Sequence, residues 1–143
     1  MGLLMKDLIV KDNALIQASY TLGLVEQRLI LLAIVEARET GRGITPDSYL
    51  DIHANHYAQQ FSVSVKSAYQ SLSEAVETLY QRQVTLHKTY KGYPERQKVR
   101  WVSGISYIEK LAAVTIRLSP DVIPLITRRE ENFTSYELEQ VAG

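Results

Sequence analysis

The sequence contains no cysteine, and this absence excludes several kinds of protein. Without a thiol there is no disulfide framework, no cysteine zinc site and no thiol nucleophile. A glycine-rich phosphate loop is also missing, because Gly41 and Gly43 flank only Arg42. The serines, carboxylates and His87 show neither a nucleophile elbow nor a triad-like pattern. We therefore expect no enzymatic activity, no redox chemistry and no cofactor.

The chain also lacks a net charge and a long apolar segment. Sixteen basic residues balance sixteen acidic ones, so the total charge favours neither nucleic acid nor an anionic membrane. The longest apolar run, LILLAIV over residues 29–35, is far shorter than the ~20 residues of a transmembrane helix. We expect no membrane association. The 143 residues are enough for one domain with its own core.

The start of the chain, MGLLMKDLIV, lacks the apolar region and cleavage site of a signal peptide. Residues 1–6 are interpreted as an N-terminal extension, a candidate for disorder, with Met5 as an alternative natural start. A short strand is expected at residues 7–10. Asn13 is the expected cap of a short helix over ALIQAS.

Good helix formers between Leu24 and Arg38 predict one long helix, which Gly41 and Gly43 follow. At 100° per residue, its apolar run projects to every side of the helix, so this part must be covered all round. The expected central-helix core residues are Leu29, Ile30, Leu32, Ala33 and Ile34. A short, uncharged run rich in Ile, Leu and Val is also a candidate aggregation segment once its helix opens.

The next segments have the outline of a helix-turn-helix. After a loop at residues 41–48 and a short strand in SYLDIHA, a helix is expected over residues 54–61. A second helix, capped by Ser62 or Ser64 and running to about Arg82, has an apolar face. That face is expected to comprise Val65, Ala68, Tyr69, Leu72, Ala75, Val76 and Leu79. The outline alone is a weak indication of DNA binding, since many helix pairs share it.

The remainder changes from a helical period to alternation. QVTLHKTY, VRWVSGISY and AVTIRL predict an antiparallel sheet of about three strands, with KGYPER as the turn after the first. In SPDVIPLI, Ser119 is the expected cap, Pro120 takes the first helical position and Pro124 limits the helix. TSYELEQVAG opens with Thr134 and Glu137, a capping box for a last helix. The expected fold class is α+β, with about five helices.

A basic segment lies within the predicted sheet. Between residues 82 and 100 there are six basic residues and one acidic residue, Glu95, so the segment has a net charge of plus five. The basic residues are Arg82, Lys88, Lys91, Arg96, Lys98 and Arg100. A basic hairpin beside a helix-turn-helix resembles a winged helix, whose wing would bind phosphates. The alternative is a solvated hairpin whose charges deter edge pairing.

The second helix offers fewer DNA contacts. Lys66, Ser67 and Gln70 near its start could touch phosphate or bases. Glu74 and Glu77 on the same side would repel phosphates, so any insertion must be shallow. His53 and His56 lack a third clustered ligand, so we expect no metal site. Trp101 is expected in the core rather than as a stacking platform.

Several segments together resemble the N-terminal winged-helix domain of iteron-binding plasmid replication initiator (Rep) proteins. They are VKDNALIQASYTLGLVEQRLILLAIVEAR, YAQQFSVSVKSAYQSLSEAVETLYQRQVTL, KVRWVSGISY and FTSYELEQ, in this order. The resemblance extends from about Asp7 to the chain end. Its most specific parts are the block from Asn13 to Arg28, the pair Arg100 and Trp101, and Phe133 with Thr134.

The resemblance implies a protein of two tandem winged helices in the bacterial cytoplasm, associated with a plasmid. In that family the first domain dimerises and contacts the backbone of double-stranded DNA, while the second reads the iterons. Monomers initiate replication, and dimers repress the rep promoter or pair origins. The full-length proteins also meet host replication proteins. We therefore expect residues 7–143 to be a dimerisation fragment or truncated product without the second winged helix. A homodimerisation domain without DNA binding remains the alternative.

Overall fold

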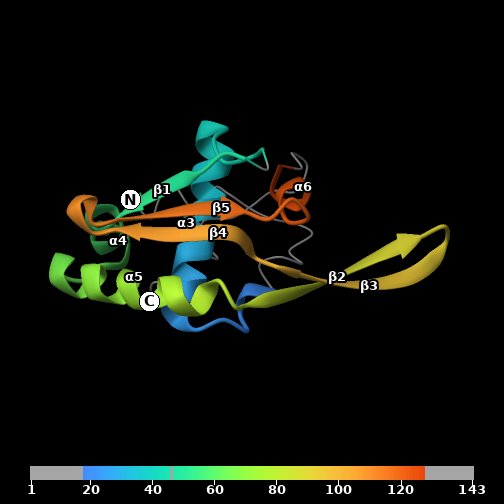
Figure 1. Ribbon diagram of the computed structural model, residues 1–143, viewed down its shortest axis with the longest axis horizontal. Coiled ribbons are helices and arrows are strands. Elements are labelled where there is room, and N and C mark those ends of the chain that lie inside the picture. Colours follow the sequence, from blue (N-terminus) through green and yellow to red (C-terminus); the bar gives the residue numbers. More distant parts are fainter. Residues whose placement is uncertain (1–17, 46, 128–143) are drawn as a thin grey trace.

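A long helix, α3 (Leu24–Thr40), runs through the centre of the structure and organises the other elements around it (Figure 1). The computed structural model describes residues 18–45 and 47–127. After α3 come β1 (Leu50–His53), α4 (Ala54–Phe61), α5 (Val65–Leu79), β2 (Gln83–Tyr90), β3 (Tyr93–Arg100), β4 (Val102–Ile108), the 3-10 helix η1 (Glu109–Leu111), β5 (Ala113–Leu118) and α6 (Ile123–Thr127).

Both ends of α3 are fixed by local hydrogen bonds. At its start the Glu26 carboxylate accepts a hydrogen bond from the Gly23 N–H at 2.8 Å. At its end Gly41 adopts a left-handed conformation, with φ of 75°, and its N–H donates to the Ala37 carbonyl at 2.9 Å. Glycine takes this conformation without a steric penalty. The long helix predicted from the sequence is confirmed and extends two residues further, to Thr40.

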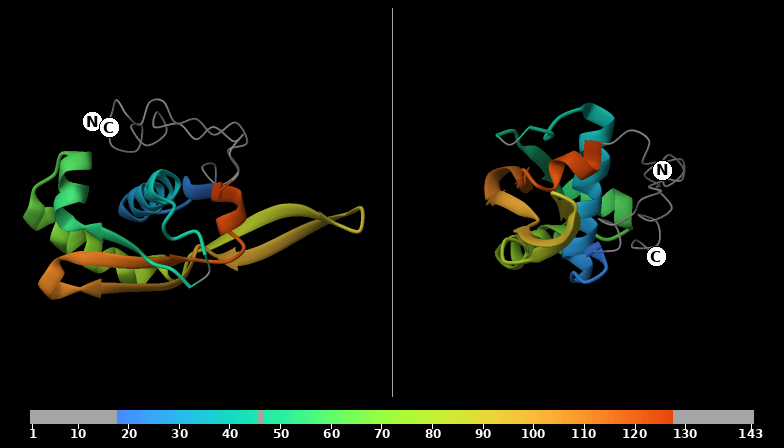
Figure 2. Two further views of the ribbon diagram at one scale, coloured as in Figure 1. Left: turned by 90° about the horizontal axis from the view of Figure 1, so that it is seen from above. Right: turned by 90° about the vertical axis from the view of Figure 1, so that its right-hand side faces the viewer.

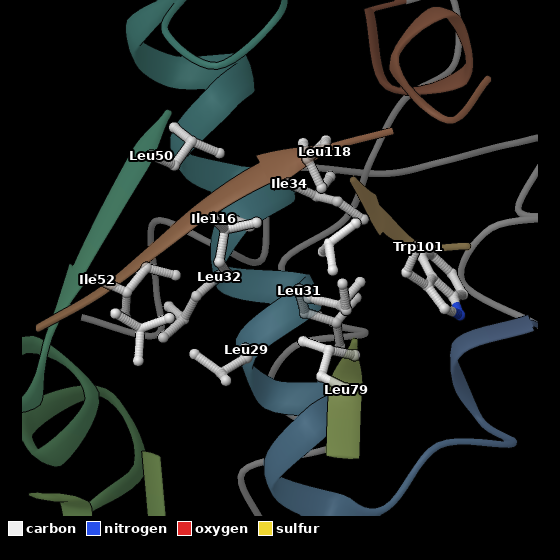
Figure 3. Packing of buried hydrophobic residues seen from close by; sticks show 14 of the residues in the cluster. Leu29, Leu31, Leu32, Ile34, Leu50, Ile52, Leu79, Trp101, Ile116 and Leu118 are labelled. Carbon is white, nitrogen blue, oxygen red and sulfur yellow. The ribbon is translucent and has the colours of Figure 1, made fainter. Parts of the chain in front are cut away.

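The apolar run in α3 is buried on every side, as its all-round pattern predicts. Leu29 through Val35 are all buried, and Leu31 has no exposed surface. Helices α5 and α6 and strand β1 pack against α3. Figure 3 shows Leu31, Leu32 and Ile34 grouped with Ile116 and Leu118 of β5. Each buried Leu or Ile contributes roughly 1.5–3 kcal/mol, so this helix anchors the fold.

The strands form two antiparallel sheets, one in the body and one projecting from it. The body sheet has the order β1-β5-β4, and the second sheet is the pair β2-β3. Helices α4 and α5 form the predicted helix-turn-helix, in which Ser62 takes a left-handed conformation and Ser64 caps α5. The small antiparallel sheets and the helices give the α+β winged-helix fold expected from the sequence.

The strands divide differently from the sequence-based expectation. VRWVSGISY is not one strand: β3 ends at Arg100, Trp101 is fully buried, and β4 begins at Val102. The Trp101 carbonyl accepts from the Ser119 N–H at 3.1 Å, and its own N–H reaches the Arg82 carbonyl at 3.4 Å. Trp101 therefore joins the two sheets from within the core. Its predicted place in the core is confirmed.

The turn between β2 and β3 is also shorter than expected. It consists of Lys91 and Gly92, with φ of 51° and 85°, and the rest of KGYPER belongs to β3. Pro94 is tolerated there because both strands of a two-stranded sheet have an outer edge that needs no ladder hydrogen bond.

Several helix details differ from the predictions. Helix α5 ends at Leu79 rather than near Arg82, and its predicted apolar positions Val65 and Tyr69 are 50% and 39% exposed. Helix α6 has five residues, Ile123–Thr127, which agrees with the one or two turns predicted, but Pro124 lies in its first turn, where a missing N–H costs nothing, rather than at its end. Pro120 precedes α6, and it is the Ser119 carbonyl, not its hydroxyl, that accepts the Ile123 N–H.

Several predictions fall outside the described residues. They are the extension at residues 1–6, the strand at 7–10, most of the short helix after Asn13 and the last helix after Thr134. Within the described residues, no helix combines the length and the apolar character needed to cross a bilayer.

Candidate nucleic-acid interface

The strands β2 and β3 form a two-stranded ribbon that extends away from the body of the domain (Figures 1 and 2). Each strand has eight residues, which corresponds to a length of about 26 Å. The register pairs Gln83 with Arg100 at the base and Tyr90 with Tyr93 at the tip. Since residues directly opposite each other share a face, this register divides the ribbon into two different surfaces.

One surface, which we call the basic face, carries cations from both strands. Thr85 lies opposite Lys98 and His87 lies opposite Arg96, so these side chains share the face with Arg100. All five are exposed. Arg100 lies over the Tyr80 ring, with its guanidinium carbon 4.8 Å from the ring centroid. Arg96 and Lys98 form no hydrogen bond or ion pair with any described residue. Their charges are therefore available to an anion.

The other surface, the tyrosine face, changes from apolar at the base to aromatic at the tip. Val84 and Leu86 are buried where the ribbon leaves the body. Further out, the Lys88 ammonium donates to Gln97 at 2.7 Å. At the tip Tyr90 and Tyr93 are 59% and 72% exposed. Lys88 and Lys91 of the predicted phosphate set thus lie on or beside this face, apart from Arg96, Lys98 and Arg100.

Arg82, at the base of the ribbon, is engaged within the molecule. Its Nε lies 2.9 Å from Glu26 Oε1, and the Glu26 side chain is only 5% exposed. Burial raises the pKa of Glu26, but hydrogen bonds from Thr78, Arg82 and the Gly23 N–H, together with the Arg82 charge, outweigh burial and lower it. Arg82 fixes the ribbon base to the start of α3. A phosphate contact by its Nε would compete with this ion pair.

The start of α5 presents the remaining predicted contacts. Lys66, Ser67 and Gln70 are all exposed there. The Ser67 N–H donates to the Ser64 hydroxyl at 3.0 Å, so its backbone donor is already used as part of the helix cap. Glu74 and Glu77, further along the helix, are also exposed. These two carboxylates separate the positive start of α5 from the positive ribbon.

The two groups of predicted contacts lie at opposite ends of the molecule. Figure 1 and the left view of Figure 2 place the start of α5 at one end and the ribbon tip at the other. In the chain, the ribbon strands β2 and β3 come between α5 and the body-sheet strand β4. The segment that lies next to the start of α5 is instead η1, which connects β4 to β5. That short connection occupies the usual position of a wing. The basic hairpin is a separate arm.

The histidine pair does not gain a third ligand in the fold. His53 ends β1 and His56 lies in the first turn of α4. Among residues 18–45 and 47–127, no group of three His, Asp or Glu side chains is placed to hold a metal ion.

The division of the ribbon into two faces was not recognised from the sequence. The signal for it was present: Lys91 and Gly92 separate two eight-residue segments, QVTLHKTY and YPERQKVR. A two-residue turn fixes the register, and the register decides which cations share a face. The predicted long turn over KGYPER does not contain this register, and so the two faces did not follow from it. The Glu26 partner of Arg82 had no local signal, because the two residues are far apart in sequence.

Comparison with known proteins identifies the family. Residues 8–143 match the family described as initiator replication protein, WH1. Among solved structures, the chain is similar to the WH1 domain of MSBI1.176, a replication protein isolated from a multiple sclerosis patient. The identity is 46% and the TM-score 0.68, over 96% of this chain and 98% of that chain.

The fold is also similar to that of the Pi initiator protein, solved in complex with iteron DNA. Here the identity is 17% and the TM-score 0.66, over 94% of this chain and 58% of that chain. The chain thus spans little more than half of that structure. From the family match and the relative at 46% identity, the chain belongs to the initiator replication protein family and corresponds to its WH1 domain.

Proposed function

We propose that this chain is the DNA-binding and dimerisation module of a plasmid replication initiator, acting at iterons and in repression of its own promoter. The observation that supports DNA binding most is the basic face of the ribbon, where Arg96 and Lys98 are exposed and have no partner among residues 18–45 and 47–127. The Pi initiator, which shares the fold, was solved with iteron DNA. The partner proposed here is therefore double-stranded DNA of the plasmid origin or operator.

The spacing on the basic face suits contact with a phosphate backbone. Arg96, Lys98 and Arg100 alternate along β3, so neighbouring cations lie about 6.8 Å apart. That distance is twice the axial rise of about 3.4 Å between charges on one DNA strand. Each cation can then meet a separate phosphate. Such contacts position a protein on DNA but carry no direct sequence information.

Helix α5 makes at most a shallow contact in this proposal. Lys66, Ser67 and Gln70 can approach DNA at the start of the helix, but Glu74 and Glu77 prevent deeper insertion through like-charge repulsion. The affinity of this domain alone is therefore expected to be near the ~10⁻⁴ to 10⁻⁶ M of nonspecific binding at physiological salt.

Fluorescence anisotropy with an iteron duplex and a scrambled duplex tests this function at about 50 and 200 mM salt. We expect similar, weak affinities for both duplexes and a marked loss at the higher salt. Tight, sequence-selective binding by this chain would contradict the proposal. Equal affinity at both salt concentrations would also contradict it, because phosphate contacts release counterions.

A second candidate function is homodimerisation without DNA binding. The described surface exposes several apolar side chains to a second copy, among them those of the ribbon tip and those at the end of the molecule where Val65 and Leu111 are 50% and 59% exposed. Light scattering over a range of concentrations tests self-association, and a monomer at every concentration contradicts it. A dimer without measurable affinity for either duplex would favour this second function over the first, whereas a dimer that binds DNA would contradict it.

A further inference from the structure

The ribbon tip carries two tyrosines at directly paired positions. Tyr90 and Tyr93 face each other across the turn, and Tyr93, at 72% exposure, is the most exposed large hydrophobic side chain among the described residues. The left-handed conformations of Lys91 and Gly92 belong to a tight two-residue turn, which fixes the register that pairs the two tyrosines. The DNA contacts proposed above use neither ring.

Positive charge accompanies the two rings. The Lys91 ammonium lies 5.3 Å from the centroid of the Tyr90 ring, and Lys88 is the next cation along the same strand. Glu95, the one acidic residue of the ribbon, lies opposite Lys88 on the tyrosine face, so these two charges offset each other and Lys91 supplies the remaining positive charge beside the rings. An aromatic surface with a cation beside it is suited to a ligand that is both flat and anionic. A nucleotide in a DNA strand has both properties.

The ribbon is twisted along its length. Two-stranded ribbons twist more strongly than the strands of larger sheets, and Figure 1 shows the two strands crossing between base and tip. The direction of each face therefore changes along the ribbon, so a nucleic-acid strand bound by the basic face near the base can follow the ribbon to the tyrosines at the tip.

We infer that the ribbon tip is a stacking platform for unpaired nucleobases, and that Tyr93 supplies the principal ring. The inference rests on the proposed function, since the DNA strand is held by Lys98 and Arg100 while a base stacks on the tip. Unpaired bases fit better than a duplex, because stacking on a paired base first requires its unstacking, at a cost of a few kcal/mol. Single-stranded DNA is thus the ligand class of the tip.

Anisotropy titrations of the 143-residue chain test this with three probes: oligo(dT) of about 15 nucleotides, an abasic oligomer of equal length, and a duplex. Tyr93→Ala is expected to lower the affinity for oligo(dT) roughly 10-fold. It should leave the affinities for the abasic oligomer and the duplex unchanged. Tyr93→Phe keeps the ring and should retain the wild-type affinity for oligo(dT). Because Tyr93 is exposed, both variants should keep the wild-type melting temperature.

The variant Lys98→Gln separates this inference from the proposed function. If Lys98→Gln weakens binding of all three probes while Tyr93→Ala changes none, DNA binding stands and base stacking is wrong. An equal loss for oligo(dT) and the abasic oligomer in Tyr93→Ala also contradicts stacking. A loss of dimer mass in Tyr93→Ala with unchanged affinity for oligo(dT) would make the tip a contact between copies instead. If Lys98→Gln affects no probe, it is the phosphate contact of the proposed function that fails.

Discussion

The Arg82 guanidinium binds the buried Glu26 carboxylate, with Nε at 2.9 and 3.0 Å from the two carboxylate oxygens. This pair connects the base of the ribbon to the first turn of α3. The Arg82 side chain is 47% exposed whereas that of Glu26 is 5% exposed, so the two partners differ in their access to water. Removing the arginine leaves a buried charge, which is costly, while removing the glutamate leaves an arginine that water can solvate.

Arg82→Ala is therefore expected to lower the free energy of unfolding by about 3 kcal/mol, because Glu26 loses its charged partner. The matched control is Arg96→Ala, an exposed arginine of the same ribbon, which should change it by less than about 0.5 kcal/mol. Urea denaturation followed by Trp101 fluorescence measures both. Equal, small effects of the two substitutions would show that the ion pair does not anchor the ribbon.

Acid should weaken the same contact. The pKa of Glu26 lies below its usual value of 4.5 in the folded chain, because the hydrogen bonds and the Arg82 charge outweigh the opposing effect of burial. A lowered folded pKa stabilises the fold above the unfolded pKa, and this contribution is lost as pH falls through the folded pKa. We expect stability to decrease below about pH 4.5. In Glu26→Gln this part of the pH dependence should be absent, and an unchanged acid profile would contradict the assignment.

Alkali should act on Tyr107. Burial, followed by the neighbouring Tyr69, raises the pKa of Tyr107 to about 12. The Tyr69 and Tyr107 rings meet edge to face with centroids 5.4 Å apart. A raised folded pKa stabilises the fold below the unfolded pKa near 10, and this contribution is lost as pH rises toward 12. Thermal melts of wild type and Tyr107→Phe should therefore differ as the pH is raised from about 10 to about 12. The melting temperature of the variant should fall less than that of wild type. Parallel losses would contradict this account.

The apolar run in α3 should be both core and aggregation segment. Leu31→Ala is expected to cost about 2–5 kcal/mol, because Leu31 is fully buried. For aggregation, Ile34→Asp places a charge inside the run, whereas Leu79→Asp disrupts the core from α5 and leaves the run intact. Under mild destabilisation, thioflavin fluorescence should show slower fibre growth for Ile34→Asp than for Leu79→Asp. Equal rates of fibre growth for the two variants would show that the run belongs to the core but does not promote aggregation.

The sequence allowed prediction of those elements whose signals are local. The helix-forming residues of α3 and the glycines that follow it, and the helix pair α4 and α5, depend on residues within a few positions of each other. The division at Trp101 could not be predicted in this way, because alternation continues from Val99 through Ile105 while the partner strand changes from β2 to β5. The Glu26 and Arg82 contact likewise depends on the tertiary arrangement rather than on a sequence pattern.

The salt dependence of DNA affinity tests the central claim most directly. In wild type, each phosphate contact contributes about 0.9 to the slope of log affinity against log salt concentration. The triple variant Arg96→Gln, Lys98→Gln, Arg100→Gln should flatten this slope by about 2.7 for duplexes of any sequence. Arg42→Gln, which removes an exposed cation in the loop after α3 and outside both groups of proposed DNA contacts, should leave it unchanged. A wild-type slope in the triple variant would contradict the assignment of the basic face as the DNA-binding surface.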